Sequence, residues 1–235
     1  MPPGHWMSVS TESGISLQKY WDLEKIVHSS PVMNMDDVVQ RYEELLRDSI
    51  ALQARSDVAV AAFLSGGVDS SIVNSQLVKS GVGGLCAFTY DFDTGGVGES
   101  ANAMRVAKIL EIDHERVELG HEDVPNYFEK VLFHQESPFT SMRVLAAHKL
   151  YELCRERGFK VVLEGQGGDQ LGAGFEYYWM AAVMDTLRDS GPQAAADLLN
   201  AFFDRFNVKK EDREMRQLQA LGAVIAQGTA TQDGC

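Results

Sequence analysis

The sequence predicts an α/β protein whose doubly wound, mainly parallel sheet is flanked by helices and followed by a helical C-terminal extension. Two observations carry this prediction. Between residues 58 and 165, short apolar runs of strand length alternate with segments that have the length and periodicity of helices. After residue 174 only helical patterns remain. Strands that alternate with helices of ten or more residues are typical of βαβ crossovers, which build parallel sheets.

The N-terminal part precedes this alternation. Residues 1–30 have a mixed composition with early prolines and glycines, which predicts an extended linker segment. Residues 35–55 predict a helix, because apolar residues recur there at three- and four-residue spacing. The acidic pair Asp36 and Asp37 suits the N-terminus of that helix.

The alternating part begins with "VAVAAFL" at 58–64, which is apolar throughout, as expected for a strand buried on both faces of a parallel sheet. The further predicted strands are 84–92, 114–119 and 159–165, and the predicted helices are 70–80, 99–110, 123–135, 143–158, 175–190, 194–206 and 211–227. The final residues, 228–235, have the composition of a disordered tail. We therefore expect a linker at 1–30, a core domain at 31–180, and a helical extension with a disordered tail at 181–235.

The composition argues against nucleic acid and membrane as partners and indicates a compartment. A formal net charge of -13 argues against the basic surface that tracks nucleic acid phosphates. The three cysteines lie far apart and form no C-x-x-C pair of a zinc or redox site, which fits a reducing compartment. No apolar run approaches the roughly 20 residues of a membrane helix. The sequence thus predicts a cytoplasmic protein that binds neither nucleic acid nor membrane.

A first candidate site lies in "FLSGGVDSSIV", residues 63–73, between a predicted buried strand and a predicted helix. The first amides of a helix lack partners and carry partial positive charge, and Gly66 and Gly67 allow a ligand to approach the backbone closely. Ser65 and Ser70 add hydroxyl donors. Together these groups predict a seat for a pyrophosphate.

Asp69 is a carboxylate in the middle of this anion seat. It is explained if a Mg²⁺ ion lies between Asp69 and the phosphates, since Mg²⁺ is usually held by one or two carboxylates plus substrate phosphates. The alternative is an ordinary strand-to-helix turn in which Asp69 and Ser70 serve as capping residues. The loop lacks the lysine of the G-x-x-x-x-G-K-[ST] loop and does not fit G-x-G-x-x-G.

A second candidate site lies in "VVLEGQGGDQLGAG", residues 161–174, again at the end of an apolar strand. Its glycines predict a second loop of close approach, and Asp169 provides a second carboxylate for Mg²⁺. A glycine-rich tight turn without a ligand is the alternative.

The motif S-G-G-x-D-S resembles the pyrophosphate loop of the ATP pyrophosphatase superfamily, and the second loop resembles G-[EQ]-G-x-D-E of the asparagine synthetase family. The segments "PPGHW", "GISLQKYWDL", "GESANAMRVAKILEIDHERVEL" and "ESPFTSM" are also similar to that family, in its order, over roughly residues 1–180. The segment 1–30 resembles the family's bridge from its glutaminase domain to its synthetase domain. The resemblance implies an adenine nucleotide alpha hydrolase-like fold.

The resemblance also implies ATP and Mg²⁺ as ligands. It places pyrophosphate on Ser65, Gly66, Gly67, Asp69 and Ser70, adenosine against Leu64, Tyr90, Glu164 and Gly165, and Mg²⁺ on Asp69 and Asp169. Asp69, Asp169 and Gln166 are the candidate catalytic residues. The implied reaction converts aspartate to β-aspartyl-AMP, which ammonia from a glutaminase domain or subunit converts to asparagine. Whether the chain forms a homo-oligomer stays open.

The sequence departs from the family pattern at four places. Gln166 stands where many members have glutamate and cannot act as a base toward ammonia, and Gln170 replaces an acidic residue. The family's R-x-P-F-L-D stretch and its lysine in R-x-K-x-G do not occur in these residues. Three hypotheses follow: an asparagine synthetase domain, a related adenylating amide ligase such as a β-lactam synthetase, peptide cyclase or sugar amidotransferase, and a non-catalytic ATP-binding or complex-forming homologue.

Overall fold

The computed structural model describes residues 1–29, 31, 33–92, 100–205 and 209. Its contacts divide the chain into two compact units, Met1–Leu52 and Gln53–Cys235. The predicted helix at 211–227 and the predicted tail at 228–235 lie outside the described residues.

The first unit contains an antiparallel hairpin and two helices. Strand β1 (His5–Ser10) pairs with β2 (Gly14–Lys19), so the segment predicted as an extended linker is paired to itself. Gly14 has a φ of +72°, which favours glycine and completes the turn between the strands. Helix α1 (Leu23–Ser29) follows, and α2 (Met35–Gln53) matches the predicted helix to within two residues.

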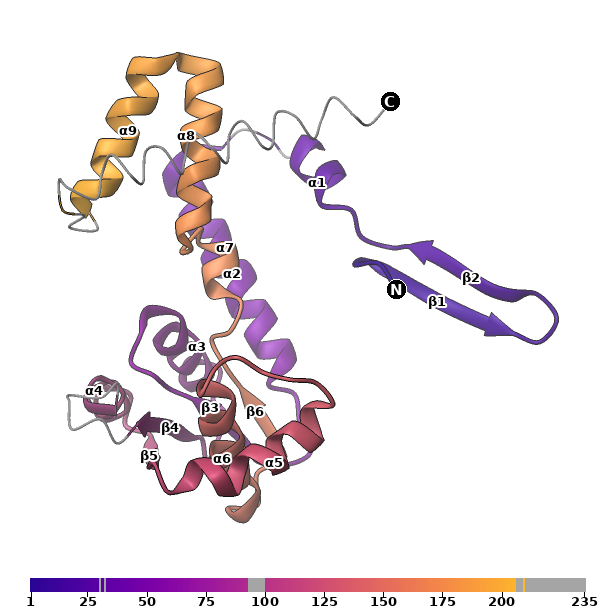
Figure 1. Cartoon of the computed structure of the whole chain (residues 1–235), viewed down its shortest axis with the longest axis vertical. Helices are drawn as coiled ribbons and strands as arrows, with labels where there is room; N and C mark the ends of the chain where they lie inside the picture. The colour runs from indigo at the N-terminus through magenta and orange to yellow at the C-terminus, as the bar shows by residue number, and fades with distance from the viewer. Residues whose placement is uncertain (30, 32, 93–99, 206–208, 210–235) are drawn as a thin grey trace. The chain divides into compact units, whose positions relative to one another are not determined.

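The second unit is built on a sheet of four parallel strands in the order β5-β4-β3-β6 (Figure 1). The strands are β3 (Val60–Phe63), β4 (Cys86–Phe92), β5 (Asp113–Leu119) and β6 (Val161–Leu163). The helices between them are α3 (Val68–Lys79), α4 (Ser100–Leu110), α5 (Asp123–Gln135) and α6 (Arg143–Glu156). The predicted α/β fold class is confirmed. Three of the four strands are shorter than predicted, because their outer residues turn into the adjoining loops.

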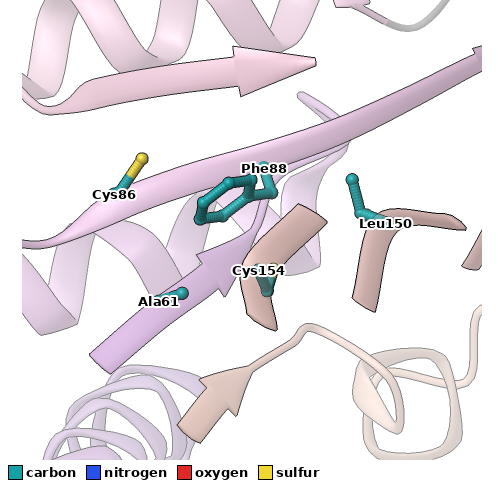
Figure 2. Packing of buried hydrophobic residues seen from close by; sticks show 5 residues of the cluster. All are labelled: Ala61, Cys86, Phe88, Leu150 and Cys154. Atoms are coloured by element: carbon teal, nitrogen blue, oxygen red, sulfur yellow. The ribbon is translucent and has the colours of Figure 1, made fainter. Parts of the chain in front are cut away.

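Helices cover both faces of this sheet. On one face, Ala103 and Ala107 of α4 pack against Leu64 and Ala87. On the other, Leu150 and Cys154 of α6 pack against Ala61, Cys86 and Phe88 (Figure 2). Cys86 and Cys154 are free thiols, and burial raises the pKa of each to about 11, so both stay protonated at neutral pH.

Three more helices follow β6. The short α7 (Gly168–Leu171), which the sequence did not predict, lies within the second glycine loop. Helices α8 (Glu176–Ser190) and α9 (Pro192–Arg205) pack on each other through Trp179, Phe202 and Phe203, as the predicted helical extension requires. Among the described helices, none combines the length and the apolarity that a membrane crossing needs.

The strand order creates a switch point between β3 and β6. From β3 the chain adds β4 and then β5 on one side, and it then returns to add β6 on the other side of β3. In open α/β sheets, ligands bind beyond the carboxyl ends of the strands at such a switch point. Both glycine-rich loops begin at these two strand ends, because one follows β3 and the other follows β6.

Candidate active site

The first loop is organised by the hydroxyls of Ser65 and Ser70. These two hydroxyls share a hydrogen bond of 2.9 Å. The Ser65 N–H donates to Ser70 Oγ (3.2 Å), and the Gly67 N–H donates to Ser65 Oγ (3.2 Å). The Ser70 hydroxyl also approaches the Gly67 carbonyl at 3.3 Å. The serines therefore hold the loop closed on itself, a role additional to the ligand contacts that were predicted for them.

Helix α3 begins directly after this loop. Its N-cap residue is Gly67, and no side chain caps the helix. Asp69 and Ser70 therefore do not cap the helix, as the alternative interpretation required, because both residues lie inside its first turn. The first amides of α3 have no intrahelical acceptor, so this end of the helix presents donors and partial positive charge to an anion.

Asn74 ties the strand end to the helix. This side chain is fully buried, and its Nδ2 donates to the carbonyls of Phe63 (3.0 Å) and Ser70 (2.8 Å). One amide thus fixes the residues on both sides of the loop. The sequence analysis did not identify Asn74. The available signal was a polar residue four positions after Ser70, on the same side of the predicted helix.

Gly66 brings the loop against the first turn of α4. Its φ is +78°, and a Cβ at this position would lie 2.5 Å from the Ala103 nitrogen and 2.6 Å from the Asn102 carbonyl carbon. Only glycine combines this conformation with this close approach. The first turn of α4 therefore forms part of the wall behind the loop.

A buried carboxylate holds that first turn. Asp91, near the end of β4, is 9% exposed, and its Oδ1 accepts a hydrogen bond of 3.2 Å from the Ser100 N–H. Arg116 of β5 approaches its other oxygen at 3.8 Å. Asp91 thus links β4 and β5 to the turn that backs Gly66.

A second polar group on the same face supports Leu64. The Thr89 hydroxyl donates to the Leu64 carbonyl, and His114 Nε2 lies 2.8 Å from Thr89 Oγ1. Since the Thr89 proton points to Leu64, His114 must donate its own Nε2–H to Thr89. Burial, with the nearby Arg116, lowers the pKa of His114 and favours its neutral form. Thr89 and Asp91 were detectable as polar residues within the buried strand "CAFTYDF", but the sequence did not show what they bind.

The second loop packs directly on the first. A Cβ on Gly165 would lie 2.7 Å from the Ser70 nitrogen and 2.9 Å from the Asp69 carbonyl carbon. A Cβ on Gly168 would overlap the Asp69 carboxyl group, with Oδ2 only 2.5 Å away. The two loops therefore meet at the Asp69 side chain, and they meet there because Gly165 and Gly168 have no side chains.

The remaining predicted residues of the second loop are placed as follows. Asp169 lies in α7, and its carboxylate faces Gly174, whose N–H donates to the Asp169 carbonyl (2.9 Å). Glu164, Gln166 and Asp169 are exposed. Within the residues that the structure describes, no group of three or more His, Cys, Asp or Glu side chains is arranged to hold a metal. The sharing of Mg²⁺ between Asp69 and Asp169 stays a prediction.

The residues predicted to contact adenosine lie around the strand ends. Leu64, Ser65 and Tyr90 line one small cavity of about 70 Å³ together with Phe63, Phe88, Thr89 and Leu150. This volume suits a few water molecules of about 30 Å³ each rather than a nucleoside. Glu164 and Gly165 follow β6, the neighbouring strand. The adenosine contacts therefore stay predictions.

A family model described as asparagine synthase matches residues 41–233. The amidase chyE of Penicillium rubens is 30% identical over 193 residues, covering 75% of this chain and 28% of that protein. The amidase chry2 of Gibberella zeae is 28% identical over 220 residues, covering 83% and 33%. Asparagine synthetase (glutamine-hydrolysing) 1 of Bacillus subtilis is 29% identical over 179 residues, covering 75% and 27%. The chain thus spans about a third or less of the length of these relatives.

Proposed function

The chain belongs to the asparagine synthase family, and we propose that its two glycine loops bind Mg-ATP and activate a carboxylic acid for amide formation. The observation that carries this proposal is the contact between the loops, in which Gly165 and Gly168 pack against Asp69 and Ser70 at the switch point of the sheet. A site built from two strand ends and a free helix N-terminus has the position and the polarity that a nucleotide requires.

The first loop is the proposed pyrophosphate seat. Amides of Gly66 and the first turn of α3 would donate to phosphate oxygens, with Gly67 and the hydroxyls of Ser65 and Ser70 beside them. Leu64, Tyr90, Glu164 and Gly165 form the proposed adenosine side.

The two loop carboxylates are the proposed magnesium ligands. Asp69 and Asp169 offer hard oxygen donors on loops in mutual contact, and Mg²⁺ commonly takes one or two carboxylates together with substrate phosphates. When bound, the ion would neutralise charge on the phosphates, which lowers the cost of attack by an anionic carboxylate. Asp69 would also be held in place by the backbone of Gly168 behind it.

The proposed reaction has two balanced steps. A carboxylate oxygen of the acid forms a bond to the α-phosphorus of ATP, and the bond from that phosphorus to the bridging oxygen breaks, releasing pyrophosphate. Ammonia then forms a bond to the acyl carbon, the bond to AMP breaks, and a proton passes from nitrogen to solvent. The loops would contribute alignment and charge stabilisation. Gln166 can donate or accept a hydrogen bond there but cannot take the proton.

The acid and the nitrogen source belong to the proposal as well. Aspartate, giving asparagine, is the first candidate, because asparagine synthetases are among the relatives. Another carboxylic acid is the second candidate, and Gln166 and Gln170 together with the amidases among the relatives favour it. Ammonia would come from a glutaminase domain or subunit.

The test measures Mg-ATP binding by calorimetry and pyrophosphate release with ammonium and a panel of acids. Asp69→Asn keeps the size of the side chain but removes its charge. We expect this variant to lose at least about tenfold in acid-dependent pyrophosphate release, because a charged oxygen ligand of the metal is removed.

The matched control is Asp113→Asn, an exposed carboxylate at the amino end of β5, on the opposite edge of the sheet. It should behave like the wild type. ATP binding that does not differ between wild type and Asp69→Asn, with equal pyrophosphate release, would contradict the proposed site. ATP binding without pyrophosphate from any acid would instead indicate a non-catalytic homologue.

A further inference from the structure

A second, larger cavity lies between α5 and α6. Its volume is about 220 Å³, and its lining includes Val131, His134, Gln135, Val144, His148 and Tyr151. Pockets for drug-sized ligands have roughly 300–1,000 Å³, so this one suits a smaller molecule than a nucleotide. Nothing described so far uses it.

This cavity adjoins the nucleotide loops through two neighbouring residues of α6. Tyr151 lines the larger cavity, and its ring packs on the ring of Phe63 with centroids 4.8 Å apart. Phe63 and Leu150 line the small cavity beside Ser65. Burial, and after it the nearby carboxylate of Glu164 at the start of the second loop, raises the pKa of Tyr151. A molecule in the larger cavity would therefore lie next to the residues from which both loops begin.

The lining offers flat rings, an amide and aliphatic side chains. The rings of His134 and His148 are stacked, with centroids 5.6 Å apart and an interplanar angle of 27°. Burial lowers the pKa of His148 and raises the pKa of Tyr151, so both are uncharged at neutral pH. Gln135 adds an amide that both donates and accepts. Hydrophobic contact comes from Val131 and Val144.

Glu152, the carboxylate beside His148, already has partners. Glu152 lies 3.8 Å from His148 Nε2, but its carboxylate is bound by Lys130 and accepts a hydrogen bond of 2.9 Å from the Tyr127 hydroxyl. Burial of a charged ligand group is costly unless an opposite charge compensates it. Glu152 is therefore compensated within the protein and does not provide a charge for a ligand.

We propose that this cavity holds the body of the acyl substrate and that this body is uncharged and flat or apolar. Aspartate would bring an ammonium group and a second carboxylate into a lining of imidazole, phenol, amide and aliphatic groups. An acid with a single carboxylate could direct that group toward the loops and place its neutral body between α5 and α6. This inference rests on the proposed function, since it assigns the acid of the same reaction.

The experiment compares acids that differ in the charge of the body. Pyrophosphate release is measured with Mg-ATP and ammonium, using benzoate, phenylacetate and butyrate against aspartate and succinate. We expect at least about tenfold higher kcat/KM for the best acid with a neutral body, a difference of about 1.4 kcal/mol. A preference for aspartate or succinate, or no stimulation by any neutral-bodied acid, would overturn the inference.

A cavity-filling variant tests the location. Ala147 lines the cavity on α6, and Ala147→Phe should fill it, raising the KM for the preferred acid at least about tenfold while the Kd for Mg-ATP stays unchanged. Ala147→Leu, which adds less volume, covers the case in which the phenylalanine disturbs folding. The matched control is Ala181→Phe, because Ala181 is exposed on α8.

The outcomes separate this inference from the proposed function. Unchanged KM for the acid in both Ala147 variants would overturn the inference and leave the ATP site intact. Loss of Mg-ATP binding in the wild type would instead overturn the proposed function, and the inference with it.

Discussion

The two glycine loops sit at neighbouring strand ends but are held in different ways. The first loop, Ser65–Ser70, is fixed by side chains, through the paired serine hydroxyls and the amide of Asn74. The second loop is fixed by the absence of side chains, because Gly165 and Gly168 lie against the backbone and the carboxylate of the first. The first loop therefore carries its own framework, and the second loop takes its position from the first.

Gly66→Ala should have the largest effect, because it breaks the framework of the first loop. The new Cβ meets the backbone of α4 in a left-handed conformation. We expect a loss of about 2–4 kcal/mol in the free energy of unfolding, from strain and overpacking together. Displacement of the loop should weaken Mg-ATP binding by about 30-fold or more, which corresponds to about 2 kcal/mol. Urea denaturation and calorimetry measure the two quantities.

Gly158→Ala is the control that separates the backbone strain of Gly66→Ala from its steric contact with α4. Gly158 also has a positive φ, +86°, but a Cβ there would meet nothing within 4 Å. It should cost about 1–2 kcal/mol of stability, from conformation alone, and leave ATP binding unchanged. Equal effects of the two variants on ATP binding would mean that contact between Gly66 and α4 does not matter.

Gly168→Ala should have an intermediate effect that is confined to the ligand site. Its φ lies outside the left-handed region, so the added Cβ costs little conformational strain, but it overlaps the Asp69 carboxyl group. Asp69 must then rotate away. We expect about tenfold weaker Mg-ATP binding, or about 1.4 kcal/mol, with a loss of stability of only about 1 kcal/mol.

The control for this variant is Gly172→Ala in the same loop, where the nearest atom to a new Cβ is 3.4 Å away. It should leave Mg-ATP binding unchanged. If Gly168→Ala also leaves Mg-ATP binding unchanged, the position of Asp69 is unimportant for the ligand. The contact between the two loops would then have no role in binding.

Much of the fold followed from local patterns in the sequence. The apolar run before Ser65 and the periodicity after it identify a buried strand and a helix, and the motif between them identifies the loop. The hairpin at the N-terminus was not predicted. Apolar and polar residues alternate at 7–10 and 15–18, but the three-residue connection between the strands carries no two-residue hairpin signal. The short helix α7 was missed for a similar reason, since glycines at 167 and 168 disguise a single helical turn.

The site was predictable only in part. Glycines and carboxylates follow a pattern along the chain, so both loops could be found. The supports come from other strands: Thr89 reaches Leu64 across β3 and β4, and Asp91 reaches Ser100 from the end of β4. Such contacts depend on strand order and register, which no local pattern specifies. The sequence could therefore name the candidate ligand residues but not the groups that hold them.

Asp91→Ala should have the smallest effect on the ligand, because it acts on the first loop through α4. Removing the carboxylate leaves the Ser100 N–H without its acceptor, which costs about 1–3 kcal/mol of stability for a buried donor. The first turn of α4 should then move away from Gly66 and weaken Mg-ATP binding by about threefold, or about 0.7 kcal/mol. Asp91→Asn keeps an oxygen for Ser100 and should bind like the wild type, since Arg116 is more than half exposed and its ion pair contributes little. Calorimetry and thermal unfolding of both variants test whether Asp91→Ala is impaired more than Asp91→Asn. If Asp91→Asn is as impaired as Asp91→Ala, the charge of Asp91 matters rather than its hydrogen bond, and support of the first loop through α4 is the wrong explanation.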